Sequence, residues 1–257
     1  MIFKLRNEMR LHKILLGSMV LAGTLFGGVH GSHWGYTGHD SPENWGDLDP
    51  EYAECKLGGS QAPINISKEI IVETKGLAPI KFHYTTGASE VVNNGHSIQV
   101  NVKPGSFIKI DGKEFELKQF HFHTPSENQI DGKNFPLEAH FVHVAKDGAI
   151  AVVAVMFEYG QENKVISRIW KKMPRMAEKK EGCGLPDAMI NNLLPKDKAY
   201  YRFDGSLTTP PCSEGVRWFV LKEYVPVSKA EVKEFLKTMK HPNNRPVQPV
   251  NARKVLQ

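Results

Sequence analysis

The chain has 257 residues, of which 40% are hydrophobic and 24% are charged, with a formal net charge of +5 at pH 7. This composition is typical of one large globular domain with an ample core, and it excludes a disordered or largely membrane-embedded chain. Because there is no stripe of Lys and Arg and no basic segment interleaved with aromatic residues, nucleic acid is not an expected partner.

Residues 1–31 differ from the rest of the chain. Four basic residues precede an uncharged run over 14–28 that is rich in Leu, Val, Ala and Gly. This pattern predicts a secretory signal peptide, cleaved near residues 29–32, and a mature protein that is periplasmic or secreted and free of the membrane. A retained N-terminal anchor is the alternative, although the run is short for a spanning helix of about 20 residues. Cleavage would remove four basic side chains and one acidic side chain, so the net charge would fall to +2.

The middle of the chain has the pattern of a β-sheet. Between residues 80 and 157, apolar and polar residues alternate in short runs, as over 98–102 and 120–123, and glycine-containing breaks separate the runs. Period-two alternation with frequent turn signals predicts consecutive antiparallel strands. The run over 150–157 is almost wholly apolar, which indicates a strand that is buried on both faces.

Helices are expected at only two places. Apolar residues repeat at helical spacing over 165–173, directly before Pro174. Ser228 and Glu231 form a capping box ahead of a second apolar stripe over 232–239. Because there is no internal repeat and no low-complexity linker, the sequence favours a single mainly β domain, of the α+β class, over residues 32–257.

Three histidines suggest a metal site within the predicted strands. His121 and His123 lie two residues apart in one strand, so both rings leave the same face. His140 has the same parity on an expected neighbouring strand. Three neutral imidazoles leave the fourth position of a tetrahedral Zn²⁺ open to water, which is the arrangement of a catalytic zinc site with one ion per chain.

Two polar residues share the faces of these histidines. These are Gln119 and Glu138, which each lie two residues before a predicted ligand. Burying such polar groups without hydrogen-bond partners would be costly. We expect them to accept hydrogen bonds from the ring nitrogens that do not bind the metal, and so to fix the orientation of the rings.

The spacing His121-x-His123-x3-Glu127 also resembles the metal motif of cupins. In that family the glutamate is a ligand, and the metal is often iron or manganese. The flanking glycines of the motif are missing, since Phe115 and Asn134 occupy their positions. The cupin alternative therefore requires Glu127 to be a metal ligand in a chain that lacks the flanking glycines of the cupin motif.

Seven stretches of the chain, in order, resemble the α-class carbonic anhydrases and in particular their secreted bacterial branch. They are residues 33–36, 61–65, 93–96, 119–127, 138–143, 207–211 and 244–246. The resemblance runs from residue 33 to about 256. It implies the fold of that family, a central, largely antiparallel, roughly ten-stranded twisted sheet with a few peripheral helices. It also implies the reaction, the zinc-dependent reversible hydration of carbon dioxide to bicarbonate and a proton.

The resemblance assigns roles to individual residues. Thr208 would accept a hydrogen bond from the attacking hydroxide and donate its own proton to Glu127, which makes Glu127 an orienting group and not a ligand. The carbon dioxide pocket would be apolar. The positions that match it are Val142, Val152, Leu207, Thr208, Thr209, Val216 and Trp218.

A proton path is implied in the same way. His96 matches the residue that carries the proton from the metal-bound water to bulk solvent, a role that suits an imidazole with an ordinary pKa near 6.5. Tyr36, Asn94 and Gln99 would line the water chain between the two.

The three cysteines, Cys55, Cys183 and Cys212, leave the choice of pair open when they are considered alone. Secreted members of the family join the positions of Cys55 and Cys212, which leaves Cys183 as the odd thiol. The resemblance further implies a cis bond between Pro210 and Pro211, inhibition by sulfonamides and anions, and a possible homodimer.

The alternative function is that of a binding module, a relative that has kept the fold but lost catalysis. Such relatives usually lack one or more of the zinc histidines.

Overall fold

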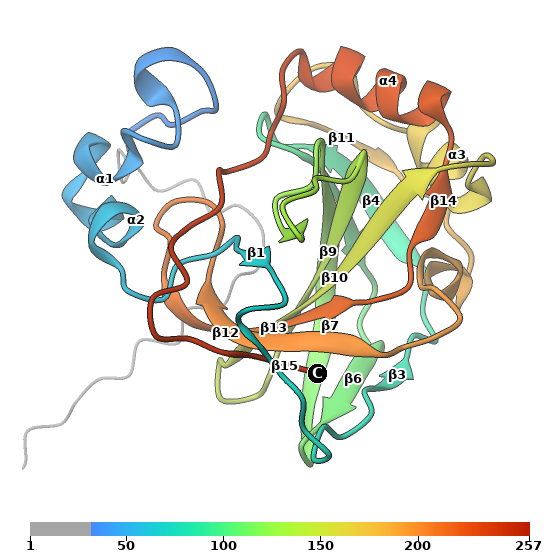
Figure 1. The fold of residues 1–257 in the computed structure, drawn as a ribbon. Coiled ribbons are helices and arrows are strands. Elements are labelled where there is room, and N and C mark those ends of the chain that lie inside the picture. The colour runs from blue at the N-terminus through green and yellow to red at the C-terminus, as the bar shows by residue number, and fades with distance from the viewer. Residues whose placement is uncertain (1–31) are drawn as a thin grey trace, which may run out of the picture.

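The computed structural model describes residues 32–257, so the predicted signal peptide lies outside the described residues. The dominant feature of this part of the chain is one large sheet of thirteen strands (Figure 1). Ten of them follow one another across the sheet, and three more pair at its sides. The mainly β, α+β fold is therefore confirmed, and the sheet is somewhat larger than the expected ten strands.

The ten strands of the central path have the following bounds. In spatial order they are β11 (Lys179–Gly182), β4 (Ala88–Asn93), β5 (Ile98–Val102), β7 (Lys113–His123), β9 (Leu137–Val144), β10 (Ile150–Tyr159), β13 (Glu214–Leu221), β12 (Tyr200–Ser206), β15 (Val255–Leu256) and β2 (Ile71–Val72). The side strands are β3 (Lys81–His83), β6 (Phe107–Ile110) and β14 (Val225–Val227). A separate two-stranded sheet joins β1 (Asn65–Ile66) to β8 (Gln129–Ile130).

Most neighbouring strands are antiparallel, as predicted, but β10 pairs in parallel with β13 and β14. A parallel pair also joins β15 to β2. The apolar run of β10 is buried from residue 151 to residue 157, as expected for a strand covered on both faces. Two large groups of core side chains lie against this sheet; Phe120 and Phe122 belong to one of them, and Val152 and Trp218 to the other.

The helices are few and short. The α-helices are α1 (Trp45–Leu48), α2 (Glu54–Leu57), α3 (Lys164–Trp170) and α4 (Lys229–Met239), and the 3₁₀ helices are η1 (Gly38–Asp40), η2 (Pro50–Tyr52) and η3 (Met189–Leu193). The predicted capping box of Ser228 and Glu231 opens α4. The predicted helix before Pro174 is α3, which Asn163 caps by accepting hydrogen bonds from two backbone N–H groups. Within residues 32–257, no helix has the length and apolar character needed to span a bilayer.

The hairpin of β6 and β7 sets the position of the predicted ligands. Asp111 and Gly112 form its turn, both with positive φ (51° and 75°), the conformation that favours an Asp-Gly pair in a two-residue hairpin. From this turn β7 runs for eleven residues, pairing first with β6 and then with β5, and ends at His123. The ligand-bearing end of β7 therefore lies between β5 and β9 in the middle of the sheet.

Candidate metal centre

Three histidines converge where β7 pairs with β9. His121 and His123 leave the same face of β7, and His140 lies directly opposite His121 on β9. One ring nitrogen from each histidine lies within 4.8 Å of those from the other two. No other group of three His, Cys, Asp or Glu side chains between residues 32 and 257 is close enough to hold a metal ion. The structure thus brings the three predicted ligands together.

Each histidine has a partner for the ring nitrogen that faces away from the group. Gln119 Oε1 lies 2.8 Å from His121 Nδ1, as predicted, whereas Glu138 Oε1 lies 3.0 Å from His140 Nε2 without the alignment of a hydrogen bond. The third partner was not anticipated: the backbone carbonyl of Asn243 lies 2.7 Å from His123 Nδ1. These partners leave His121 Nε2, His123 Nε2 and His140 Nδ1 as the nitrogens that can turn to a common ion.

The chemistry of this group fits a zinc ion. His123 Nε2 is fully buried and has no hydrogen-bond partner among the described residues, a costly state that a metal ion would relieve. Burial lowers the pKa of all three rings, and for His121 and His140 the neighbouring His123 lowers it further. The rings are therefore held neutral, which is the form that ligates, and an all-imidazole set of three is a zinc donor set.

Glu138 is itself held by a loop that sequence reasoning did not connect to it. Its carboxylate accepts hydrogen bonds from the backbone N–H groups of Glu127 (2.7 Å) and Asn128 (3.0 Å) and from the Asn128 side chain (2.8 Å). Burial raises the pKa of Glu138, and these donors act in the opposite direction. The hydrogen bonds fix the carboxylate that faces His140.

Glu127 lies against the ring nitrogens but is not a member of the metal-competent group. Its Oε1 accepts a 2.8 Å hydrogen bond from the backbone N–H of Arg245. Burial raises the pKa of Glu127 to about 8, while the Arg245 N–H and the nearby Thr208 hydroxyl lower it. Its Oε2 makes no well-aligned hydrogen bond within the described chain. This arrangement disfavours the cupin alternative, which needs Glu127 as a ligand.

Comparisons with known proteins decide the family. The model of the eukaryotic-type carbonic anhydrase family matches residues 40–257. The chain belongs to this family. A carbonic anhydrase of Neisseria gonorrhoeae is 47% identical over 247 residues, which cover 95% of this chain and 96% of that protein. One of Klebsiella pneumoniae is 48% identical over 231 residues, which cover 89% and 92%.

Solved structures agree with the sequence relatives. The α-carbonic anhydrase of Thermovibrio ammonificans, determined in complex with the inhibitor sulfanilamide, matches with a TM-score of 0.85 and 49% identity and covers 88% of this chain and 100% of its own. The chain is therefore an enzyme, a carbonic anhydrase, and its reaction is the reversible hydration of carbon dioxide. The non-catalytic binding module is excluded as its function.

The residues matched to the carbon dioxide pocket of carbonic anhydrases lie in one apolar cluster beside His140. Val152, Val216 and Trp218 are buried in this cluster, and Val142 and Leu207 pack against it. The Trp218 ring lies 4.9 Å from the His140 ring at an angle of 81°. Thr208 and Thr209 follow Leu207 on the loop between β12 and β13, where the Thr209 carbonyl accepts a hydrogen bond from Cys212 N–H.

His96 differs from the expectation in one respect. Its ring stacks on Trp34 with centroids 3.7 Å apart and planes 11° apart. Burial, and then the nearby His33 and His241, lower the pKa of His96 to about 4 instead of leaving it near 6.5. The expected ordinary pKa is therefore wrong for this position of the ring. The sequence could not reveal this difference, because it does not show which side chains bury the ring.

The three residues matched to the water chain have separate contacts. Tyr36 Oη is buried without a partner in the described chain, and burial and then the Glu127 charge raise the pKa of Tyr36. Asn94 Oδ1 accepts hydrogen bonds from the backbone N–H groups of His96 and Ser97. Gln99 on β5 lies directly opposite His121 on β7 and donates to Asn101 at 2.7 Å.

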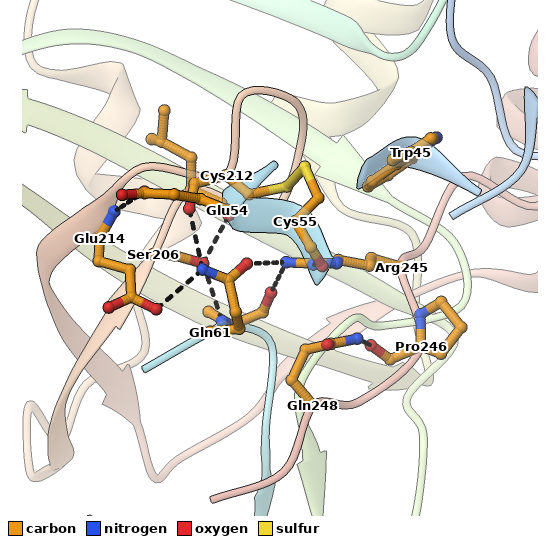
Figure 2. Close-up of a disulfide and its surroundings, with 12 residues drawn as sticks. Trp45, Glu54, Cys55, Gln61, Ser206, Cys212, Glu214, Arg245, Pro246 and Gln248 are labelled. Atoms are coloured by element: carbon orange, nitrogen blue, oxygen red, sulfur yellow. Dashed lines mark hydrogen bonds between the residues drawn. A yellow bond between two sulfur atoms is a disulfide. The ribbon is translucent and has the colours of Figure 1, made fainter. Parts of the chain in front are cut away.

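The expected disulfide is present. Cys55 and Cys212, 157 residues apart in the chain, are bonded (Figure 2). Cys183 is a buried free thiol. The Pro210–Pro211 bond is cis, as implied by the resemblance, and two further cis bonds precede Pro63 and Pro125. The disulfide joins α2 to the loop that carries Thr208.

Proposed function

We propose that His121, His123 and His140 bind one Zn²⁺ and that the residues around them hydrate carbon dioxide in the way inferred from the sequence. The observation that carries the proposal is the convergence of three neutral imidazoles, each with its outward nitrogen facing a different oxygen atom. When bound, zinc supplies a Lewis acid that makes a coordinated water acidic enough to lose its proton near neutral pH.

Thr208 and Glu127 orient the attacking oxygen in this proposal. A threonine hydroxyl has one proton, so donating it to Glu127 leaves Thr208 Oγ1 only as an acceptor. An oxygen bound next to Thr208 must then donate its own proton, and its lone pair is directed away from Thr208. This arrangement requires an ionised Glu127. Glu127 would be ionised when the three neutral imidazoles hold a cation, because an opposite charge nearby lowers the pKa of a carboxyl.

The apolar cluster beside His140 is the proposed carbon dioxide pocket. Carbon dioxide has no hydrogen-bond donor, so a wall of Val142, Val152, Leu207, Val216 and Trp218 can hold it without desolvating a protein polar group. Thr209 lies next to Thr208 at the polar side of this wall. Sulfonamide and anion inhibitors would bind at the same place; the complex of the Thermovibrio relative with sulfanilamide supports sulfonamide binding.

His96 is the proposed carrier of the proton to solvent, along water held by Tyr36, Asn94 and Gln99. Its partly exposed position beside Trp34, on a loop where Asn94 accepts a hydrogen bond from the His96 backbone, supports this role. Burial, and then His33 and His241, lower the pKa of His96 to about 4 in this position, so a more exposed position of the ring would favour proton uptake near neutral pH.

The site of action proposed for the enzyme is outside the cytoplasm. The disulfide is typical of oxidising compartments, and the first 31 residues have the pattern of a cleaved signal. Sequencing the N-terminus of the protein recovered from the producing cell would test this part.

Stopped-flow measurement of carbon dioxide hydration tests the proposed zinc site. The purified protein should contain about one zinc per chain, lose its activity when a chelator removes the metal, and regain it when Zn²⁺ is added. His140→Ala should reduce both zinc content and rate, whereas His83→Ala, an exposed histidine on β3, should leave both unchanged. Full hydration activity in protein shown to be free of metal would overturn the proposal.

A further inference from the structure

Arg245 is a buried arginine whose contacts reach well beyond the histidine site. Its Nη1 donates to Gln61 Oε1 (2.9 Å) and to the Ala62 carbonyl (2.8 Å), and its Nη2 donates to the Cys55 carbonyl at 2.8 Å (Figure 2). Only 1% of the residue is exposed. Burying a guanidinium is costly unless its hydrogen bonds are made, so these three acceptors fix its position. The backbone N–H of the same residue holds Glu127.

Gln61 carries this connection to the loop that bears Thr208. While its Oε1 accepts from Arg245, its Nε2 donates to the Cys212 carbonyl and to Glu214 Oε1, both at 3.0 Å. The Gln61 side chain thus bridges Arg245 on one side and Cys212 and Glu214 on the other, as Figure 2 shows. A side chain in place of Gly58 would collide with both the Gln61 amide and the Glu214 carboxylate, so this position of Gln61 depends on close backbone packing.

The next residue supports the other end of the same loop. Ala62 N–H donates to Ser206 Oγ at 2.9 Å, and Ser206 Oγ donates to the Leu207 carbonyl at 2.7 Å. Gln61 and Ala62 therefore hold the chain on both sides of Thr208, at residues 207 and 212. The disulfide is a second link between Arg245 and this loop, because Arg245 Nη2 donates to the Cys55 carbonyl and Cys55 is bonded to Cys212.

We propose that Gln61 and Arg245 form a positioning pair that sets the separation between Thr208 and Glu127. The inference rests on the proposed function, in which Thr208 donates its proton to Glu127. Arg245 fixes Glu127 through its backbone N–H, and Gln61 fixes the Thr208 loop through Cys212. The Gln61–Arg245 hydrogen bond joins the two, so its loss lets the donor and the acceptor move relative to each other.

The test is a double-mutant cycle with Gln61→Met and Thr208→Val. Methionine keeps the volume of Gln61 and removes all of its side-chain hydrogen bonds. We expect Gln61→Met to lower kcat/KM for carbon dioxide hydration by about 10-fold, a loss typical of partners that orient catalytic groups, with zinc content and disulfide intact. The kcat should fall less, because the proposed proton transfer through His96 does not involve the loop.

Coupling distinguishes positioning from a general structural effect. If Gln61 acts through Thr208, Gln61→Met should have little further effect on kcat/KM once Thr208→Val is present. Gln248→Met is the matched control, because the Gln248 side chain donates to the carbonyl of Pro246 in its own segment and the substitution keeps the backbone N–H that donates to Pro63; it should leave kcat/KM unchanged. If Gln61→Met does not fold, Gln61→Glu keeps the acceptor for Arg245 but loses the donor to Cys212 and should show the same coupling.

Two outcomes would overturn the inference. One is an unchanged kcat/KM in the Gln61 variants. The other is an equal loss whether or not Thr208→Val is also present, which would place the effect of Gln61 elsewhere. A Thr208→Val variant with undiminished kcat/KM would instead refute the role of Thr208 in the proposed function, so the two failures are distinguishable.

Discussion

His143 should make the folded protein sensitive to acid. This histidine lies on β9 three residues beyond His140 and is completely buried. Its Nδ1 lies 3.2 Å from the Ala151 carbonyl and its Nε2 lies 2.7 Å from Tyr84 Oη, so the neutral ring donates to the carbonyl and accepts from the tyrosine. Burial lowers the pKa of His143 to about 3.

The sign and size of the effect follow from linkage. An unfolded histidine has a pKa of about 6.5, so below that pH the unfolded chain binds a proton that the folded chain resists down to about pH 3. Stability is therefore lost as the pH falls through this window. At about 1.4 kcal/mol per pKa unit, the loss amounts to about 2 kcal/mol at pH 5 and about 3 kcal/mol at pH 4.

Guanidinium unfolding of the protein and of His143→Gln at pH 8, 5 and 4 measures this loss. The glutamine removes the titrating group and keeps a hydrogen-bond donor and an acceptor. Each protein is compared with itself at pH 8, so any pH-independent cost of the substitution cancels. Both proteins have the same three proposed ligands, which removes acid release of a metal from the comparison. His83→Gln, at an exposed position, is the control. If the protein and the His143 variant lose the same stability between pH 8 and pH 5, the reasoning is refuted.

Two further results are expected. His96→Ala should lower kcat by about 10-fold or more in dilute buffer while kcat/KM changes little, and imidazole buffer should partly restore kcat; equal losses in both constants would contradict the proton-carrying role. Replacing Cys55 and Cys212 together with serine should reduce the free energy of unfolding by about 5 kcal/mol in the chain-entropy view of a link between residues 157 apart. A loss below about 1 kcal/mol in denaturant unfolding would show that the disulfide adds little to the contacts around it.

Much of the metal centre could be predicted from local pattern. In a strand the side-chain period is two, so residues of equal parity share a face whatever the rest of the fold does. That rule placed His121 with His123, and it placed Gln119 and Glu138 beside the rings that they orient. The alternation of polar and apolar residues likewise identified the strands of the middle of the chain, and the capping box identified α4.

Other features depend on contacts between distant residues that no local pattern encodes. The order of the sheet inserts β13 between β10 and β12 in a partly parallel arrangement, although β10 and β13 are more than fifty residues apart. The edge strand β11 lies in a segment without a recognisable motif. The lowered pKa of His96 follows from burial and from His33 and His241, which only the fold brings near it.

The segment 243–245 shows why the remaining partners could not be found from sequence. Asn243 uses its carbonyl for His123 and its side-chain amide for the carbonyls of His96 and Phe122, and Arg245 uses its N–H for Glu127. Strands consume their backbone groups in pairing, whereas an irregular segment has them free to bind side chains. The sheet therefore sets the direction of the ligands, and the irregular chain beside it supplies hydrogen bonds that orient them. Because a backbone group belongs to every residue type, the amino acid at such a position does not reveal its role.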